Sequence, residues 1–155
     1  MDWLTPSQRS RNMRAIRAKN TKPEVAVRRS LHALGFRFRL HISGLPGRPD
    51  IVMRKLQLII HVKGCFWHGH RCLKGRIPEG NRAYWLKKIL GNKSRDRRNA
   101  RRLRSMGWRA VTLWECDIRR WKPKQLEAKL KKLIPRSTGQ RSRRQPVIRA
   151  LPTRS

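Results

Sequence analysis

Acidic residues are scarce in this sequence. Eight Asp and Glu stand against 41 Lys and Arg in 155 residues, which gives a formal net charge of +33 at pH 7. Charge of one sign at this density destabilises a compact chain unless a polyanion or counterions relieve the repulsion. Nucleic acid is the polyanion that fits best, because each phosphate neutralised by Lys or Arg releases a condensed counterion. An acidic membrane surface is the weaker alternative.

Long apolar runs and a secretory leader are also missing. No segment approaches the length needed to span a membrane, and the N-terminus lacks the charged-then-apolar pattern of a signal peptide. Apolar residues as such are not scarce: 37% of the chain is hydrophobic and six residues are Trp, which argues against a purely disordered basic tail. We therefore expect a folded intracellular protein with one domain and a genuine core.

Composition divides the chain into three parts. Residues 1–20 form a basic arm that we expect to contact nucleic acid, and residues 21–135 carry the periodic segments of a folded domain. No acidic residue follows Glu127, and residues 136–155 contain arginines and prolines without a sustained period. We expect this last segment to be a disordered basic tail that is free to touch DNA.

The middle segment predicts a mixed α/β domain. A helix begins at Thr21, which stands in capping-box spacing with Glu24, and ends at Gly35. Alternating and β-branched stretches predict four strands, and two further segments predict helices, the first with Gly91 as a place for a bend or a split. The strands are expected at 36–40, 50–53, 56–62 and 108–114, and the helices at 81–106 and around 126–134. This order favours a mixed β-sheet flanked by helices.

All three cysteines and one histidine form a candidate metal site. Cys65, His70 and Cys72 are close enough in sequence to converge on one ion, and Cys116 follows a predicted strand that can lie beside them. Three thiolates and one imidazole fill a tetrahedral shell, which is the pattern of a closed, structural zinc site. An odd cysteine count in an intracellular protein argues against disulfides. The alternative is that the cysteines are ordinary small buried residues.

An acid and a lysine stand at the ends of neighbouring predicted strands. Asp50 follows Pro49 at the start of one strand, and Lys63 comes at the end of the next. The pair resembles the Pro-Asp…(Asp/Glu)-x-Lys pattern of restriction-endonuclease-like nucleases, where the acid holds Mg²⁺ beside the scissile phosphate. The match is incomplete, because His61 stands where that pattern has its second acid. We interpret His61 as a core or pocket-edge histidine rather than a ligand.

Four longer motifs carry a closer resemblance. They are RNMRAI at 11–16, LPGRPD at 45–50, GCFWHGHRC at 64–72 and WEC at 114–116. In this order and spacing they resemble the very-short-patch-repair (Vsr) DNA mismatch endonuclease family. The resemblance implies a restriction-endonuclease-like fold for residues 21–135 and a Mg²⁺-dependent nick in double-stranded DNA, on the T strand of a T:G mismatch left by deaminated 5-methylcytosine. It further implies a monomer in the bacterial cytoplasm, associated with the nucleoid, and mismatch-repair proteins as candidate partners.

The resemblance also implies roles for individual residues. Asp50 would be the carboxylate ligand of Mg²⁺, with the backbone carbonyl of Val62 completing the protein ligands. His68 would be the general acid or base near the scissile phosphate, and Glu24 would contact the metal-bound water shell. Lys63 departs from the best-known family members, which have a histidine in the catalytic pocket at this position. A lysine there would hold the phosphate or the attacking water.

Three apolar side chains are implied to contact the mismatch. Met13, Phe66 and Trp67 would wedge into the base stack, which costs a few kcal/mol per step and less at a mispaired step. Phe66 and Trp67 can instead be core aromatics, as we expect for the other tryptophans, including Trp85, Trp108 and Trp114. The arginines of 95–104 are interpreted as a solvated helix face that follows phosphates without reading sequence.

Alternatives remain for the polar roles and for the whole protein. Glu24 can be only the capping partner of Thr21, and His68 can be only a support for the metal ligand His70. The rival functions are a non-catalytic zinc-containing DNA-binding module and a basic RNA-binding protein. Asp50 and His68 together count against the first rival, because a pure binder needs neither.

Overall fold

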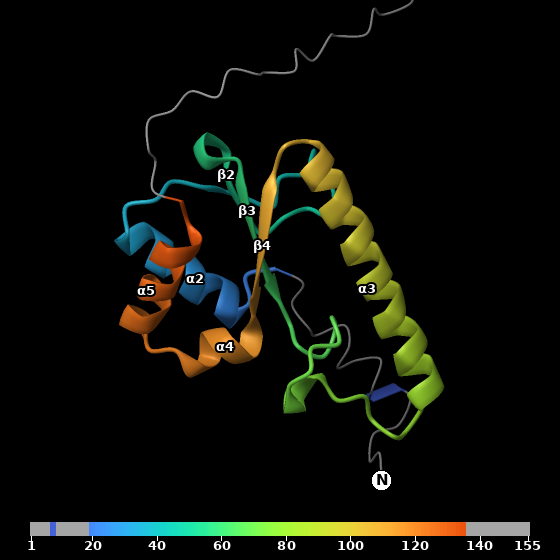
Figure 1. The fold of residues 1–155 in the computed structure, drawn as a ribbon. Coiled ribbons are helices and arrows are strands. Elements are labelled where there is room, and N and C mark those ends of the chain that lie inside the picture. Colours follow the sequence, from blue (N-terminus) through green and yellow to red (C-terminus); the bar gives the residue numbers. More distant parts are fainter. Residues whose placement is uncertain (1–6, 9–18, 136–155) are drawn as a thin grey trace, which may run out of the picture.

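A four-stranded sheet runs through the middle of the protein, with helices on both of its faces (Figure 1). The computed structural model describes residues 7–8 and 19–135. Strand β2 pairs antiparallel with β1 and β3, whereas β3 and β4 are parallel. The mixed sheet flanked by helices that the sequence predicts is confirmed. In spatial order the strands are β1 (Arg39–Leu40), β2 (Ile51–Met53), β3 (Leu58–Lys63) and β4 (Arg109–Trp114).

The helices separate into two groups. Three of them pack together on one face of the sheet, and one long helix covers the other face (Figure 1). The first group is α2 (Lys22–Ala33), α4 (Glu115–Arg120) and α5 (Pro123–Leu133), and the long helix is α3 (Arg82–Ser105). Two short 3₁₀ turns, η1 (Arg54–Leu56) and η2 (Leu73–Gly75), connect the elements. No helix in the described part of the chain is long and apolar enough to cross a membrane.

Alternation along the inner strands assigns each side chain to one of the two faces. Ile60 belongs to the larger core, which β2, β3 and β4 form with α2, α4 and α5. Its neighbour Ile59 belongs to the smaller core, which includes Leu103 of α3. Because successive side chains of a strand point to opposite faces, His61 and Lys63 continue the face of Ile59. The last polar residues of β3 therefore lie on the side of the sheet that α3 covers.

The start of α2 follows the predicted capping pattern with one shift. Thr21 is the N-cap, and its side-chain oxygen accepts a hydrogen bond from the Glu24 backbone N–H at 3.4 Å. The Glu24 carboxylate accepts in return from the backbone N–H of Asn20 and from the Thr21 hydroxyl, each at 3.0 Å. The helix stops before Gly35, whose φ of +80° suits glycine. These local bonds hold the Glu24 side chain in the first turn of α2.

Three details of the sequence prediction are wrong. The strand expected at 36–40 is confined to β1, because Phe36 and Phe38 pack against the larger core and only the last two residues pair with β2. Helix α3 passes through Gly91 without a break. Helix α4, which carries Cys116, was not predicted. It begins directly after β4, and two acids in its first turn stabilise it by interacting favourably with the helix dipole.

The remaining elements follow the sequence pattern. Strands β2, β3 and β4 and helix α3 lie within two residues of the predicted bounds, and α5 begins three residues before the predicted start. The implied wedge residue Met13 lies outside the described residues, as do the tail of 136–155 and most of the arm of 1–20.

Candidate active site and metal cluster

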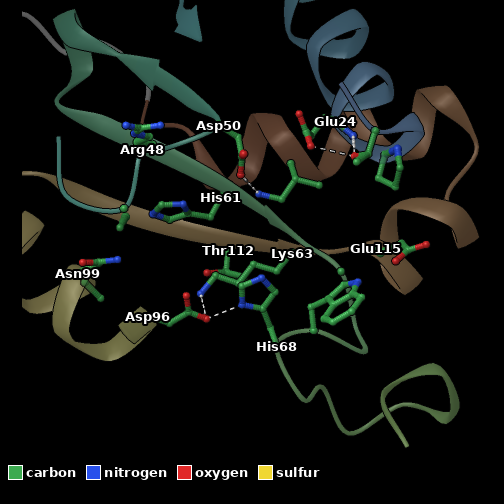
Figure 2. A pocket seen from close by; sticks show the side chains of 18 of the residues that line it. Glu24, Arg48, Asp50, His61, Lys63, His68, Asp96, Asn99, Thr112 and Glu115 are labelled. Carbon is green, nitrogen blue, oxygen red and sulfur yellow. Dashed lines mark hydrogen bonds and ion pairs between the residues drawn. The ribbon is translucent and has the colours of Figure 1, made fainter. Parts of the chain in front are cut away.

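A cleft of about 790 Å³ opens between the sheet and α3. Side chains from α2, β3, α3 and the connecting loops meet in it, so the site forms only when these elements pack (Figure 2). All four residues expected in catalysis line this cleft, together with Val62 and Trp67. The four are Glu24, Asp50, Lys63 and His68.

Asp50 lies in the cleft at the end of the turn that precedes β2. Its Oδ2 accepts a hydrogen bond from the backbone N–H of Val62 at 2.8 Å, which ties it to the neighbouring strand (Figure 2). Burial raises the pKa of Asp50 above its ordinary value, although the Val62 hydrogen bond opposes this, and the negative charge of Glu24 raises it further. A nearby cation would relieve this cost of holding a carboxylate in ionised form.

Glu24 is more strongly engaged than Asp50. Its carboxylate is buried, with 3% of the residue exposed, and Arg28 pairs with Oε2 at 2.9 Å. Together with the bonds from Asn20 and Thr21, both oxygens have partners on or beside α2. The capping interpretation of Glu24 is therefore correct for its local structure. Glu24 still lines the cleft that contains Asp50.

Asp96 is a cleft residue that the sequence analysis missed. It lies on α3 and its Oδ2 meets both His68 Nδ1 at 2.6 Å and Lys63 Nζ at 2.9 Å (Figure 2). Burial alone raises the pKa of Asp96, but the hydrogen bonds from His68 and Lys63 outweigh it and lower the pKa to about 2. The available signal was that Asp96 is the only acid in the 24 residues of α3.

His61 lies at the edge of the cleft, as the sequence predicts. It projects from β3 beside Thr112 of β4, and both residues line the cleft. Burial, followed by the charge of Lys63, lowers the pKa of His61 to about 4. His61 is therefore neutral at physiological pH, and it contributes an uncharged polar side chain to the lining of the cleft.

Phe66 and Trp67 belong to an aromatic cluster at the start of α3. The two rings meet edge to face at 5.1 Å, and both also contact Trp85, which is buried as expected. Lys88 lies over the Trp67 ring at 5.6 Å from its centroid. Both rings keep partial exposure, and Trp67 lines the cleft. The two rings are therefore partly exposed and also pack against Trp85.

The four predicted metal ligands converge on one point. The candidate ligand atoms of Cys65, His70, Cys72 and Cys116 all lie within 4.8 Å of one another, and all three cysteines are free. A zinc–sulfur bond of about 2.3 Å sets tetrahedral ligands about 3.8 Å apart, so small adjustments close the shell. The fourth residue comes from the first turn of α4, which follows β4 beside β3.

The loop around this cluster is tightly built. His70 stacks on Trp114 with ring centroids 4.3 Å apart, and a Cβ at Gly75 would overlap the His70 carbonyl oxygen. Burial raises the pKa of the Cys65 thiol to about 12, whereas the His70 hydrogen bond lowers that of Cys72 to about 6. Four donors, three thiols and one imidazole, leave no open position, and this matches a structural zinc site better than a catalytic one.

Comparison with known proteins places these features in context. The family model described as DNA mismatch endonuclease Vsr matches residues 1–74. The type II nicking enzyme V.XorIIP of Xanthomonas oryzae pv. oryzae is 47% identical over 117 residues, which covers 76% of this chain and 86% of that protein. The type II nicking enzyme V.NmeAIP of Neisseria meningitidis is 43% identical, with coverages of 76% and 84%. The DNA mismatch endonuclease Vsr of Escherichia coli is 42% identical, with coverages of 72% and 71%.

Proposed function

Since this chain belongs to the DNA mismatch endonuclease Vsr family and is therefore an endonuclease that nicks DNA, we propose that it cuts the T strand at T:G mismatches in a Mg²⁺-dependent reaction. The biological substrate would be the product of 5-methylcytosine deamination, on nucleoid DNA in the bacterial cytoplasm. The observation that carries the proposal is the meeting of Asp50, Lys63, His68 and Asp96 in one cleft.

Asp50 fits a hard divalent cation. Only one of its oxygens accepts a strong hydrogen bond, so Oδ1 remains available in a cleft that is open to a phosphate. Carboxylate and backbone carbonyl oxygens are ligands that Mg²⁺ prefers, and it keeps several waters besides. Asp50 and the backbone carbonyl of Val62 would hold the ion, and Glu24 would face its water shell. The bound ion would supply Lewis-acid chemistry, which activates water and stabilises the leaving oxygen.

His68 is the candidate general acid or base. The pKa of Asp96 at about 2 keeps that carboxylate ionised, so it can only accept hydrogen bonds. His68 therefore carries its proton on Nδ1, which donates to Asp96 at 2.6 Å. Its Nε2 then has a free lone pair with which to take a proton from water, and the resulting imidazolium can return it to the leaving oxygen. Asp96 would orient the ring and stabilise its charged form.

Lys63 would bind the phosphate beside the scissile bond. Its ammonium group lies 2.9 Å from Asp96 and shares the cleft with Asp50. A lysine donates up to three hydrogen bonds as a compact point charge, so contact with Asp96 leaves donors for a phosphate oxygen. Lys63 thereby provides a cation in the same pocket in which His68 moves a proton.

Mismatch recognition would use the aromatic cluster and the arm. Trp67 lines the cleft and is partly exposed, and Phe66 supports it from the side. Opening a base step is cheapest where pairing is already poor, so a rigid aromatic wedge favours a mismatch over a paired duplex. Met13 would complete the wedge, the rest of the basic arm of residues 1–20 would contact DNA, and the basic tail of 136–155 would add contacts to the phosphate backbone. The protein would act as a monomer, alone or with mismatch-repair proteins.

Zinc is the proposed occupant of the Cys65–His70–Cys72–Cys116 cluster. The closed set of four ligands leaves no position for substrate. The ion would instead hold the loop that carries Trp67 and His68 against the start of α4. Its role in the reaction is therefore to keep His68 and Trp67 in place.

The direct test is a nicking assay on matched duplexes. End-labelled DNA that differs only in one T:G or T:A pair is incubated with Mg²⁺ or with EDTA, and an Asp50→Ala preparation controls for contaminating nuclease. We expect a nick in the T strand of the T:G duplex that requires both Mg²⁺ and Asp50. Selective binding without nicking would favour the non-catalytic DNA-binding module. Preference for structured RNA over mismatched DNA would favour the RNA-binding alternative.

A further inference from the structure

His41 lies next to Asp50, the proposed Mg²⁺ ligand, and the reaction above gives it no role. It follows β1, and its backbone N–H donates to the carbonyl oxygen of Asp50 at 3.4 Å. Its side-chain Nδ1 lies 3.9 Å from Asp50 Oδ1, the oxygen that Val62 does not engage. The φ of His41 is +47°, a left-handed conformation that costs energy for most residues. The His41 backbone therefore bonds to Asp50, and its side chain lies beside the Asp50 carboxylate.

The contact with Arg28 determines which nitrogen of His41 carries the proton. Arg28 Nη2 lies 3.0 Å from His41 Nε2, and a guanidinium has donors but no acceptor. Nε2 must therefore accept this hydrogen bond, so it bears no proton and the proton of the ring is on Nδ1. That Nδ1–H is the group that faces Asp50. At 3.9 Å it is too long for a direct hydrogen bond, but it places a partial positive charge near the carboxylate.

Arg28 itself is held in place by two further contacts. Its Nη2 pairs with Glu24 Oε2 at 2.9 Å, and its Nη1 donates to Asn20 Oδ1 at 2.7 Å. The side chain is only 13% exposed, and its Nε is buried without a hydrogen-bond partner in the described part of the chain. An unmade hydrogen bond of this kind has a cost. The position of Arg28 is thus set by its terminal nitrogens, which link Glu24 to His41.

We infer that His41, oriented by Arg28, is a positioning residue that holds the Asp50 carboxylate for a divalent cation. The series Glu24–Arg28–His41–Asp50 connects two of the cleft's acids through two side chains that have no step in the proposed reaction. Groups that orient a metal-binding carboxylate change metal affinity about 10- to 100-fold when removed. The inference rests on the proposed role of Asp50 as a metal ligand, and it adds two residues that make this acid ready to bind.

The test measures metal binding directly as well as nicking. Mn²⁺ is titrated into zinc-loaded, full-length protein without DNA, and the signal of free Mn²⁺ is followed by electron paramagnetic resonance. We expect His41→Ala to raise the dissociation constant about 10-fold, the lower end of the usual range because the contact is long. The Mg²⁺ concentration for half-maximal nicking should rise in parallel, while the rate at saturating Mg²⁺ and duplex affinity in EDTA stay near wild type.

Two variants distinguish positioning from a general loss of structure. His41→Gln keeps one donor and one acceptor on the side chain and should restore most of the Mn²⁺ affinity. His32→Gln changes a histidine at the exposed end of α2 and should leave Mn²⁺ binding and nicking unchanged. A folded His41→Ala protein that binds Mn²⁺ as tightly as wild type would show that the inference is wrong.

If His41→Ala does not fold, the Mn²⁺ titration of Arg28→Lys tests the inference instead. The lysine keeps the positive charge beside Glu24 but has a single nitrogen, so it loses the second anchor that Arg28 Nη1 makes to Asn20 and no longer holds a fixed donor against His41. Weaker Mn²⁺ binding by this variant supports the inference, and unchanged binding overturns it. Failure of the wild-type protein to nick any mismatch would instead contradict the proposed function, because Mn²⁺ binding is read without DNA.

Discussion

The cleft and the Cys/His cluster share one stretch of chain, since Lys63 ends β3, Cys65 begins the cluster, and Trp67 and His68 of the same loop line the cleft. The cluster collects three of its four ligands from eight consecutive residues and has no open position. The cleft instead collects its polar groups from α2, β3, α3 and two loops, and Asp50 is held by a single strong hydrogen bond. Closure suits a site that stabilises structure, and openness suits a site that exchanges water and phosphate.

Loss of the cluster should have the largest effect on stability. Binding of a structural zinc ion contributes about 10 kcal/mol or more to small metal-dependent folds, so His70→Ala should release the ion and loosen the loop of residues 64–80. We expect zinc content to fall and the midpoint of thermal unfolding to drop. His32→Ala serves as the matched control. Normal zinc content and an unchanged midpoint for His70→Ala, measured by mass spectrometry and calorimetry, would contradict the structural role.

Loss of Asp50 should abolish the reaction and leave the cluster intact. A divalent ion contributes several kcal/mol to stabilising a charged transition state, which corresponds to a loss of about 10³-fold or more in rate. We therefore expect Asp50→Asn to lose nicking on the T:G duplex while its zinc content stays normal. Zinc loss in this variant would mean that the two sites are not independent. Single-turnover nicking and zinc content on the same preparation give the answer.

Loss of Asp96 should slow the reaction without removing the metal ligand. Asp96→Asn takes away the charge that fixes the His68 tautomer and stabilises its protonated form. A positioned acid–base group contributes about 10²- to 10⁴-fold, so we expect a loss of about 10²-fold in the single-turnover rate, with unchanged Mg²⁺ dependence.

The control for Asp96 is Asp117→Asn, because Asp117 lies on α4 outside the cleft and pairs only weakly with Arg120 at 3.9 Å. Equal rates for both variants and wild type would exclude the proposed His68–Asp96 pair.

The smallest effect should come from the basic tail, which belongs to neither site. Removal of residues 136–155 takes away positive charge, so the logarithm of DNA affinity should depend less steeply on the logarithm of salt concentration. Each lost phosphate contact lowers the slope by about 0.9. Zinc content and the Mg²⁺ dependence of nicking should not change. Identical slopes in filter-binding titrations of the full and shortened chains would show that the tail does not contact DNA.

Elements with local causes could be predicted from the residues alone. The capping residues Thr21 and Glu24 define the start of α2, and the run of β-branched residues predicts strand β3. The metal cluster was also accessible, because Cys65, His70 and Cys72 are neighbours in the chain and only one cysteine remained for the fourth position. In the helix cap, and for three of the four metal ligands, the interacting groups lie within a few residues, so their spacing carries the information.

The distant residues that complete the cleft could not be predicted, because they come together only when helices and strands pack. Asp96 lies among arginines on α3 and meets Lys63 and His68 because that helix packs across the sheet. His41 reaches Asp50 through a left-handed backbone turn that no residue type requires. A side chain's partner across 28 residues, as for His68 and Asp96, depends on how helices and strands pack together. That packing follows from burying Ile59, Val52 and Leu103, whose pattern says nothing about the polar groups carried beside them.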